Sequence, residues 1–407
     1  MKYGLIGEKL GHSFSKVIHE RLGYDYELVE ISPEILDAFM RKRDFLGINI
    51  TLPYKEKVIP YLDEIDENAR AIGAVNTIVN RGGRLYGYNT DFYGMQMLFS
   101  HAGIDVYDKK AAILGSGGTA KTAKAVLKSL GAKEIINISR SGKISYNELY
   151  ASHSDVEIIV NTTPVGMYPN IFDQIVDINK FGKLSGVIDA VYNPLSTAII
   201  TRAKQNGIAA EGGLYMLVGQ AIRASELFLD MKYPSYMVDV IYDGIHAEKE
   251  NIVLIGMPSS GKSTVGRILA EKLGSHFVDT DDLITDRIKM PISEFFAFHG
   301  EEEFRKIESE VIREIAGQNG LVIATGGGAI LKEENVFNLK YNGNIIFIDR
   351  PLDLLIPTES RPLSNSRSTL EDLYNKRYPI YCDVCDIHVK ASGTPTQVAE
   401  NILENYL

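Results

Sequence analysis

Two glycine-rich loops, each between an apolar run and a helical pattern, constrain the fold of this chain more than any other feature. The first lies in AAILGSGGTAKTAKAVLKSLG, residues 111–131, and the second in NIVLIGMPSSGKSTVGRILAEKLG, residues 251–274. Each loop leads into a helix whose first N–H groups are available to bind phosphate. The loops lie about 140 residues apart. A loop of either type normally follows the first strand of its own parallel sheet. The sequence therefore predicts an α/β protein with two separate nucleotide sites.

Composition excludes several other classes of protein. The formal net charge of −10 argues against a nucleic-acid partner, which calls for a basic face. The only cysteines, Cys382 and Cys385, exclude a disulfide framework. They also lack the further ligands of a closed zinc site, so we expect them to pack in the core.

No apolar run reaches the roughly 20 residues of a membrane span, and the N-terminus has no signal-peptide pattern. We expect a soluble, cytoplasmic protein with no membrane partner.

The first glycine loop fits the dinucleotide pattern G-x-G-x-x-A. Gly115 makes the tight turn, Gly117 lets the backbone approach a pyrophosphate, and Ala120 lets the helix pack on the strand. The residues expected to hold the dinucleotide are Gly115, Ser116, Gly117, Gly118, Thr119 and Ala120.

The strand EIINI, residues 134–138, follows at the distance where a second dinucleotide contact is expected. An NAD-binding protein places an acidic residue after this strand to accept from the ribose 2′-hydroxyl. This chain has Ser139, Arg140 and Ser141 there instead. An arginine flanked by hydroxyls suits a 2′-phosphate. The loop therefore predicts NADP(H) as the cofactor.

Four polar stretches interrupt the first hundred residues: GHSFSK (11–16), NITLPYK (49–55), GAVNT (73–77) and GYNTD (87–91). They offer hydroxyls, amides, one lysine and one carboxylate, a set that suits a small polyhydroxylated carboxylic acid. Taken singly, such residues are more often found in turns and helix caps.

Together these stretches resemble shikimate dehydrogenase, whose motifs occur in the same order. The later motifs NTTPVGM (161–167), DAVYNP (189–194) and GGLYMLVGQA (212–221) are similar as well. The resemblance implies that Ser13 and Ser15 hold the substrate carboxylate, and that Gly213 faces the cofactor. It places around the ring oxygens Thr51, Lys55, Asn76, Asp91 and Gln220, with Tyr192 nearby.

The reaction that this resemblance implies is chemically coherent. Hydride from the nicotinamide attacks the ketone of 3-dehydroshikimate, and the developing alkoxide needs a proton. Lys55 can donate that proton and stabilise the negative charge. Asp91 is expected to orient the lysine, so both are predicted catalytic residues.

The second loop, Gly256 to Ser263, is the P-loop pattern G-x-x-x-x-G-K-S. Its backbone N–H groups cradle phosphates, Lys262 reaches the β- and γ-phosphates, and Ser263 binds Mg²⁺. ATP is the expected nucleotide. The residues expected to bind it are Gly256, Ser259, Ser260, Gly261, Lys262, Ser263 and Thr264.

The rest of the C-terminal part resembles shikimate kinase in FVDTDD (277–282), GEEEFRKIE (300–308), TGGGAI (325–330), SRPLS (360–364) and KRYPIY (376–381). The resemblance implies Asp279 beside the metal and Asp281 as the catalytic residue at the acceptor hydroxyl. Lys262 is the second catalytic residue. The residues expected at the substrate are Arg305, Gly326, Gly327, Gly328 and Arg377, and Arg361 is expected to close on the nucleotide in a short lid.

The two resemblances imply three domains. A substrate-binding α/β domain is expected over 1–100, completed by helices of about 221–246, and an NADP-binding Rossmann domain over 101–220. A P-loop domain like the nucleoside-monophosphate kinases is expected over 251–407, after a polar boundary at 246–250. The product of the first reaction, shikimate, is the substrate of the second, which predicts a bifunctional enzyme.

Two alternatives stay open from the sequence. In one, the kinase-like half binds nucleotide without catalysis, which would show as missing catalytic residues. In the other, the first half oxidises quinate with NAD, against which Arg140 and the pair Ser13 and Ser15 argue. The relative orientation of the two halves is open, and so is a monomeric or homodimeric state.

Overall fold

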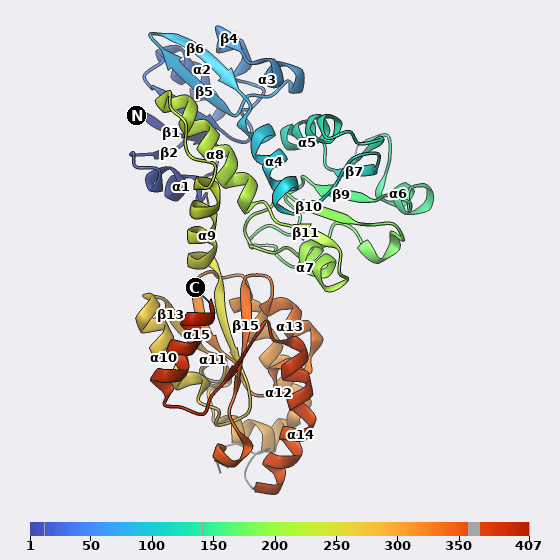
Figure 1. Ribbon diagram of the computed structural model, residues 1–407, viewed down its shortest axis with the longest axis vertical. Coiled ribbons are helices and arrows are strands. Elements are labelled where there is room, and N and C mark those ends of the chain that lie inside the picture. Colours follow the sequence, from blue (N-terminus) through green and yellow to red (C-terminus); the bar gives the residue numbers. More distant parts are fainter. Residues whose placement is uncertain (12, 141, 357–366, 407) are drawn as a thin grey trace. The chain divides into compact units, whose positions relative to one another are not determined.

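The computed structural model describes residues 1–11, 13–140, 142–356 and 367–406 (Figure 1). The chain forms two compact units, Met1–Ile245 and His246–Leu407. The division falls within helix α9 (Met237–Lys249), so most of the polar stretch 246–250 is helical.

The first sheet of the N-terminal unit is mixed, with strand order β2-β1-β3-β5-β6-β4. Its strands are β1 (Tyr3–Gly7), β2 (Glu27–Glu30), β3 (Gly47–Ile50), β4 (Glu64–Ile65), β5 (Thr77–Arg81) and β6 (Arg84–Tyr88). Beside it lie the helices α1 (Ser15–Arg21), α2 (Pro33–Lys42) and α3 (Glu67–Ile72), and the 3-10 turn η1 (Ile59–Tyr61). Strands β3 and β5 are antiparallel, and their register pairs Asn49 with Thr77.

The second sheet of this unit is fully parallel, with order β11-β10-β9-β7-β8. Its strands are β7 (Lys110–Leu114), β8 (Glu134–Ile138), β9 (Ile158–Asn161), β10 (Gly186–Asp189) and β11 (Ala209–Glu211). Its helices are α5 (Gly118–Ser129), α6 (Tyr146–Ser152) and α7 (Ala198–Gln205), with the 3-10 turn η2 (Ile178–Lys180). This is a doubly wound order, in which ligands bind where the strand order reverses, here between β7 and β9.

Helices α4 (Thr90–His101) and α8 (Leu214–Leu229) run beside each other between the two sheets (Figure 1). Gly94 of α4 permits their close approach, since a Cβ atom there would lie 2.4 Å from the carbonyl oxygen of Met216. The ring of Phe228, at the other end of α8, fills the space over Gly47 of β3. The pairing brings the first turn of α4 next to the middle of α8, where Gln220 lies.

The C-terminal unit has one parallel sheet of order β13-β14-β12-β15-β16. Its strands are β12 (Asn251–Ile255), β13 (His276–Asp279), β14 (Leu321–Ala324), β15 (Gly343–Asp349) and β16 (Ile387–Lys390). Its helices are α10 (Lys262–Leu273), α11 (Thr280–Ile288), α12 (Ile292–Ala316), α13 (Glu333–Leu339), α14 (Arg367–Val384) and α15 (Pro395–Tyr406), with the 3-10 turns η3 (Ala329–Leu331) and η4 (Leu352–Leu354). Helix α12 kinks at Gly300, whose φ is 81°.

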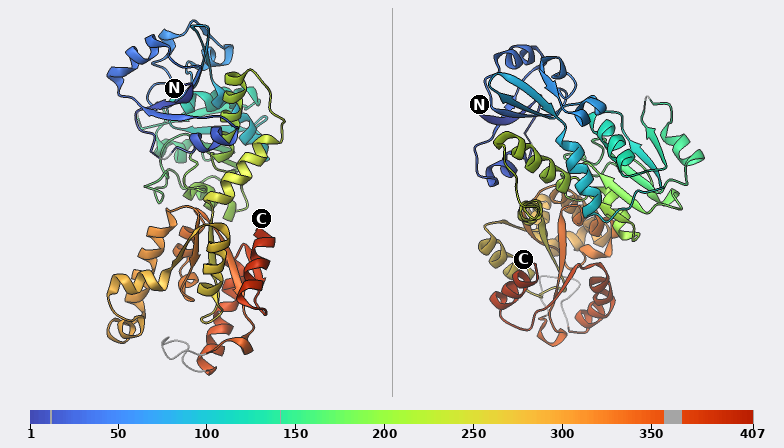
Figure 2. Two further views of the ribbon diagram at one scale, coloured as in Figure 1. Left: turned by 90° about the vertical axis from the view of Figure 1, so that its left-hand side faces the viewer. Right: turned by 45° about the horizontal axis from the view of Figure 1, so that its top comes forward.

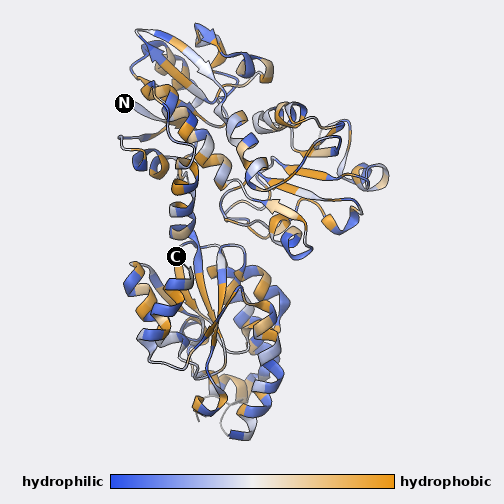
Figure 3. Cartoon of the chain, viewed as in Figure 1, coloured by the Kyte–Doolittle hydropathy of each residue, from blue (hydrophilic) through white to orange (hydrophobic). Residues whose placement is uncertain are grey.

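Helices cover both faces of this sheet, as Figures 1 and 2 show. Its three central strands β12, β14 and β15 are accordingly mostly hydrophobic (Figure 3), as expected of a parallel sheet buried on both sides. Separate apolar clusters fill the two sides, one with Val253, Ile323 and Ile345 and the other with Leu254 and Ile346.

The prediction that both cysteines pack in the core is wrong for Cys382, which is exposed, while Cys385 is partly buried. Cys382 lies in the last turn of α14, whose buried face is taken by Leu370, Arg377 and Tyr381, and Cys385 follows directly after the helix. Among the residues that the structure describes, none of the helices combines the length and the apolar composition that a membrane crossing demands.

Candidate active sites

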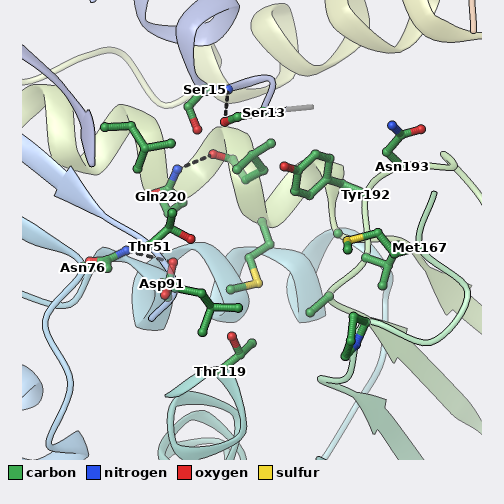
Figure 4. A pocket seen from close by; sticks show the side chains of 18 of the residues that line it. Ser13, Ser15, Thr51, Asn76, Asp91, Thr119, Met167, Tyr192, Asn193 and Gln220 are labelled. Carbon is green, nitrogen blue, oxygen red and sulfur yellow. Dashed lines mark hydrogen bonds between the residues drawn. The ribbon is translucent and has the colours of Figure 1, made fainter. Parts of the chain in front are cut away.

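The N-terminal unit encloses a cavity of about 490 Å³, a size suited to a small ligand. Its walls come from the ends of β1 and β3, from α4 and α8, and from the loops after β9 and β10 (Figure 4). The predicted site residues that line it are Ser13, Ser15, Thr51, Lys55, Asn76, Asp91, Thr119, Tyr192, Gly213 and Gln220.

Lys55 and Asp91 form an ion pair at this cavity. The Lys55 Nζ donates to Asp91 Oδ2 at 2.6 Å, and the side chains are only 15% and 11% exposed. Asp91 lies in the first turn of α4, where free N–H groups favour a carboxylate. Its other oxygen, Oδ1, accepts from Asn76 Nδ2 at 2.8 Å. Both carboxylate oxygens are therefore engaged, and the lysine is held in one place.

A buried network of amides and hydroxyls fixes the orientation of Asn76. Its Oδ1 accepts from the Thr90 backbone N–H at 2.7 Å, which turns its NH₂ group toward Asp91. Behind it, Asn49 Nδ2 donates to Thr77 Oγ1 at 2.9 Å, and Asn49 Oδ1 accepts from a tyrosine hydroxyl. Asn49 lines the cavity and was not among the predicted site residues, although it begins the stretch NITLPYK.

Hydroxyls gather in another part of the cavity. The backbone N–H of Ser15 donates to Ser13 Oγ at 3.3 Å, and Tyr192 lies near Ser13 (Figure 4). Burial raises the pKa of Tyr192, against an opposing hydrogen bond with Ser13. Its hydroxyl therefore stays protonated at neutral pH and can donate a hydrogen bond.

The first glycine loop leaves β7 in a conformation that requires glycine. Gly115 has φ of 122°, and a Cβ atom there would lie 2.5 Å from Thr162 Oγ1. Of the loop residues predicted to bind the dinucleotide, Thr119 reaches the cavity. After β8, Ser139 is buried and Arg140 is exposed, while Ser141 lies outside the described residues.

The loops after β9 and β10 supply cavity residues that the sequence did not identify, namely Thr162, Thr163, Met167 and Asn193. Both loops are tied to Asp189 at the end of β10. This carboxylate accepts from Thr197 Oγ1 at 2.6 Å, from the Val191 N–H at 2.9 Å and from Asn161 Nδ2 at 3.0 Å. Burial raises the pKa of Asp189 to about 6. The sequence does carry a signal for these loops: the apolar strands β9 and β10 each end in a polar residue, Asn161 and Asp189.

In the C-terminal unit, the P-loop has positive φ at Gly256, Ser259 and Gly261, and such turns aim N–H groups at an anion. The Lys262 Nζ donates to the carbonyl oxygens of Gly256 at 3.0 Å and Met257 at 2.9 Å. In this loop Ser260 is buried and Thr264 is exposed.

The predicted metal-binding residues meet at the end of β13. Ser263 Oγ donates to Asp279 Oδ2 at 2.6 Å. The other oxygen of Asp279 accepts from the backbone N–H of Asp281 at 3.0 Å. This contact holds Asp281 at the start of α11.

The predicted substrate residues of this unit also come together. A Cβ atom on Gly328 would lie 2.2 Å from an Arg305 guanidinium nitrogen, and one on Gly326 would lie 2.9 Å from Asp281 Oδ1. Arg377 is buried on α14. The glycine loop 326–328 therefore lies directly against Arg305 and Asp281. Arg361 falls outside the described residues.

Arg305 is paired within the protein. It donates to Glu308 Oε2 at 2.7 Å and to Glu301 Oε1 at 3.0 Å. Burial raises the pKa of Glu308, against the opposing effect of the Arg305 guanidinium. Glu308 was not predicted, although its spacing of three residues from Arg305 places both on one helical face.

Two family models match the chain. The model of the shikimate dehydrogenase substrate binding domain matches residues 5–78, and the shikimate kinase model matches residues 258–407. A curated relative, the NADP(+) shikimate dehydrogenase of Clostridium perfringens, is 38% identical over 263 residues, which are 59% of this chain and 97% of the relative.

Solved structures agree over the same part of the chain. Shikimate dehydrogenase 1 from Peptoclostridium difficile is 39% identical, with a TM-score of 0.56, and the match covers 60% of this chain and 98% of that one. The Thermus thermophilus shikimate 5-dehydrogenase, solved in complex with NADP(H) and shikimate, is 27% identical with a TM-score of 0.54, over 60% and 99% of the two chains.

Proposed function

The chain belongs to the shikimate dehydrogenase family and carries a shikimate kinase domain after it, and from this premise we propose that it performs two consecutive reactions. The first reduces 3-dehydroshikimate to shikimate with NADPH. The second phosphorylates shikimate to shikimate 3-phosphate with ATP. The observation that carries the first assignment is the Lys55–Asp91 ion pair in a cavity rich in hydroxyls and amides.

We propose that Lys55 is the proton donor of the first reaction. NADPH supplies the hydride that adds to the ketone carbon. The ketone oxygen, becoming an alkoxide, takes a proton from the Lys55 ammonium, so that a secondary alcohol results. Asp91 holds the lysine and accepts from a substrate hydroxyl. The hydroxyls of Ser13, Ser15 and Tyr192 are suited to bind the substrate carboxylate.

The residues around the first glycine loop fit NADP(H). The close approach of Gly115 to Thr162 and the start of α5 at Gly118 leave N–H groups for a pyrophosphate. The exposed Arg140 is suited to the 2′-phosphate, since no acidic residue takes its place. We assign residues 101–220 to cofactor binding, and 1–100 with about 221–246 to substrate binding.

In the second reaction, residues 251–407 transfer the phosphoryl group that ATP supplies. The shikimate 3-hydroxyl oxygen bonds to the γ-phosphorus while the bond to the leaving ADP breaks, and Asp281 accepts the hydroxyl proton. Arg305 and Arg377 bind the shikimate carboxylate as bidentate donors. Lys262 stabilises the charge on the transferred group. Ser263 and Asp279 would hold Mg²⁺, because both offer the oxygen ligands that this ion prefers.

The test is a coupled assay on the purified full chain with 3-dehydroshikimate, NADPH, ATP and Mg²⁺. NADPH absorbance reports the first step, and mass spectrometry detects shikimate 3-phosphate. We expect both signals, and we expect chelation of Mg²⁺ to stop only the second. If NADPH is consumed but added shikimate is never phosphorylated, the kinase assignment is wrong. If NADH serves as well as NADPH, the role of Arg140 is wrong.

A further inference from the structure

We propose that Tyr381 is a positioning residue of the phosphoryl transfer, because its hydroxyl joins the loop that holds the phosphates to the loop that faces the acceptor. This inference rests on the proposed kinase function. It adds a residue that acts through the backbone of both loops and also forms a hydrogen bond with the side chain of Arg377.

The Tyr381 side chain is completely buried on α14. Its ring stacks on Phe347 of β15, with centroids 4.9 Å apart and planes at 18°. Its hydroxyl lies 2.9 Å from the carbonyl oxygen of Gly256 and 2.5 Å from that of Gly327. Gly256 is the first glycine of the P-loop, and Gly327 is the middle residue of the acceptor loop 326–328. One phenol therefore bridges the two loops.

The two loops also touch each other directly. A Cβ atom on Gly327 would lie 3.0 Å from Cδ of Pro258 in the P-loop. The acceptor loop thus packs on the P-loop without room for a side chain. Apolar contact alone permits sliding, whereas hydrogen bonds from a fixed hydroxyl set distance and direction.

The phenol has one O–H hydrogen, and the carbonyl oxygens of Gly256 and Gly327 share it. Burial raises the pKa of Tyr381, so the phenol keeps its proton. The Gly256 carbonyl oxygen also accepts from Lys262 Nζ at 3.0 Å. When Lys262 turns to a phosphate, that carbonyl loses the ammonium and keeps the phenol. Tyr381 therefore holds the P-loop backbone in place while its lysine engages the nucleotide.

Helix α14 also carries Arg377, one turn before Tyr381 and likewise buried. The same helix therefore presents a cation for the substrate carboxylate and fixes the separation of the two loops. In-line transfer depends on this separation, and an error of about 1 Å in the placement of reacting groups can cost roughly 100-fold in rate. The hydroxyl should therefore affect kcat more than the binding of either substrate.

The variant Tyr381→Phe tests this, because it removes the hydroxyl and keeps the ring on Phe347. We expect the kinase kcat to fall about 10-fold, within the range for a small misplacement, with both KM values within about twofold. The dehydrogenase activity of the same chain should be unchanged and reports the concentration of chains with a folded first unit, while thermal unfolding reports the second unit. The matched control is Tyr378→Phe on the same helix, whose hydroxyl donates to Asp349 Oδ2 at 3.3 Å and which should keep full kinase activity.

With an active wild-type kinase, three results would overturn the inference. An unchanged kcat in Tyr381→Phe means that the hydroxyl does not position the loops. A lower thermal midpoint or a misfolded second unit, with normal kcat in the folded fraction, makes the hydroxyl purely structural. An equal loss in Tyr378→Phe assigns the effect to α14 in general. If the wild-type chain phosphorylates no shikimate, the proposed kinase function itself fails, and this inference falls with it.

Discussion

The two sites differ in how their charged groups are held. In the N-terminal unit, Lys55 is bonded to Asp91, a second group of the proposed reaction. In the C-terminal unit, Lys262 is bonded to carbonyl oxygens of its own loop, and Arg305 to Glu308 and Glu301. The dehydrogenase site is thus arranged for its reaction in advance, whereas ligands of the kinase site must compete with internal acceptors.

The difference follows from the charge of the ligands. A hydride transfer to a ketone develops one negative charge, which one well-placed ammonium can stabilise. A nucleotide and a carboxylate bring several charges, and the cations that receive them would be costly to bury unpaired. Internal partners such as Glu308 remove that cost until a ligand replaces them.

The largest loss of activity is expected in the dehydrogenase site, where Lys55 is already held by Asp91. Lys55→Ala removes the proposed proton donor and should lower the dehydrogenase kcat by about 10³-fold, since general acid catalysis contributes roughly 10² to 10⁴. Kinase activity on added shikimate should be unchanged. The exposed neighbour Lys57 provides the control Lys57→Ala. Near-normal reduction by Lys55→Ala would remove the lysine from the chemistry.

The second prediction concerns the other half of the comparison. Lys262→Ala should lower kinase activity by about 10²- to 10³-fold, the range for loss of one group that stabilises transition-state charge. Shikimate should then accumulate from 3-dehydroshikimate at the normal rate. Lys272→Ala, which removes an exposed lysine of the same helix paired with Glu400, should leave both activities intact. A kinase that tolerates Lys262→Ala would contradict the P-loop assignment.

The third prediction concerns Asp189, which holds the loops behind the dehydrogenase cavity. Its pKa is raised to about 6, so between about pH 4 and pH 6 the folded chain keeps a proton that the unfolded chain has lost. Its contribution to the free energy of unfolding therefore falls as pH rises, by about 3 kcal/mol at 1.36 kcal/mol per pKa unit.

Asp189→Asn cannot titrate and should lack this dependence. We therefore expect the stability of Asp189→Asn relative to wild type to rise from pH 4.5 to pH 6.5. Urea unfolding, with loss of dehydrogenase activity as the signal of the first unit, measures it. If the difference in stability between the two proteins does not change with pH, Asp189 does not titrate between pH 4.5 and pH 6.5, and the prediction is wrong.

The smallest expected effect tests whether Glu301 competes with the substrate carboxylate for Arg305. Glu301→Gln removes one partner of Arg305 that is about half exposed, and exposed ion pairs are worth roughly 0.2–1 kcal/mol. The KM for shikimate should therefore fall about two- to threefold. Glu302→Gln, which removes a partner of Lys306 instead, is the control. A higher KM in Glu301→Gln would mean that Glu301 orients Arg305 rather than competing for it.

The glycine loops could be predicted from sequence because they are local, with strand, turn and helix in one segment. The Lys55–Asp91 pair joins residues 36 positions apart, and only the resemblance to shikimate dehydrogenase suggested it. Asn49 enters the network through the register of β3 with β5, which no local pattern determines. Tyr381 could not be identified either, because its partners lie on two other segments. The exposure of Cys382 could not be predicted either, because its residue type does not reveal which face of α14 it occupies.

The central claim is that one chain carries two complete and separate enzymes in sequence. It is tested most directly by mixing Lys55→Ala with Lys262→Ala in the presence of 3-dehydroshikimate, NADPH, ATP and Mg²⁺. Neither variant alone should form shikimate 3-phosphate at an appreciable rate. The mixture should form it, since shikimate made by Lys262→Ala is free to reach the kinase site of Lys55→Ala. A mixture that consumes NADPH but yields no shikimate 3-phosphate would contradict the account.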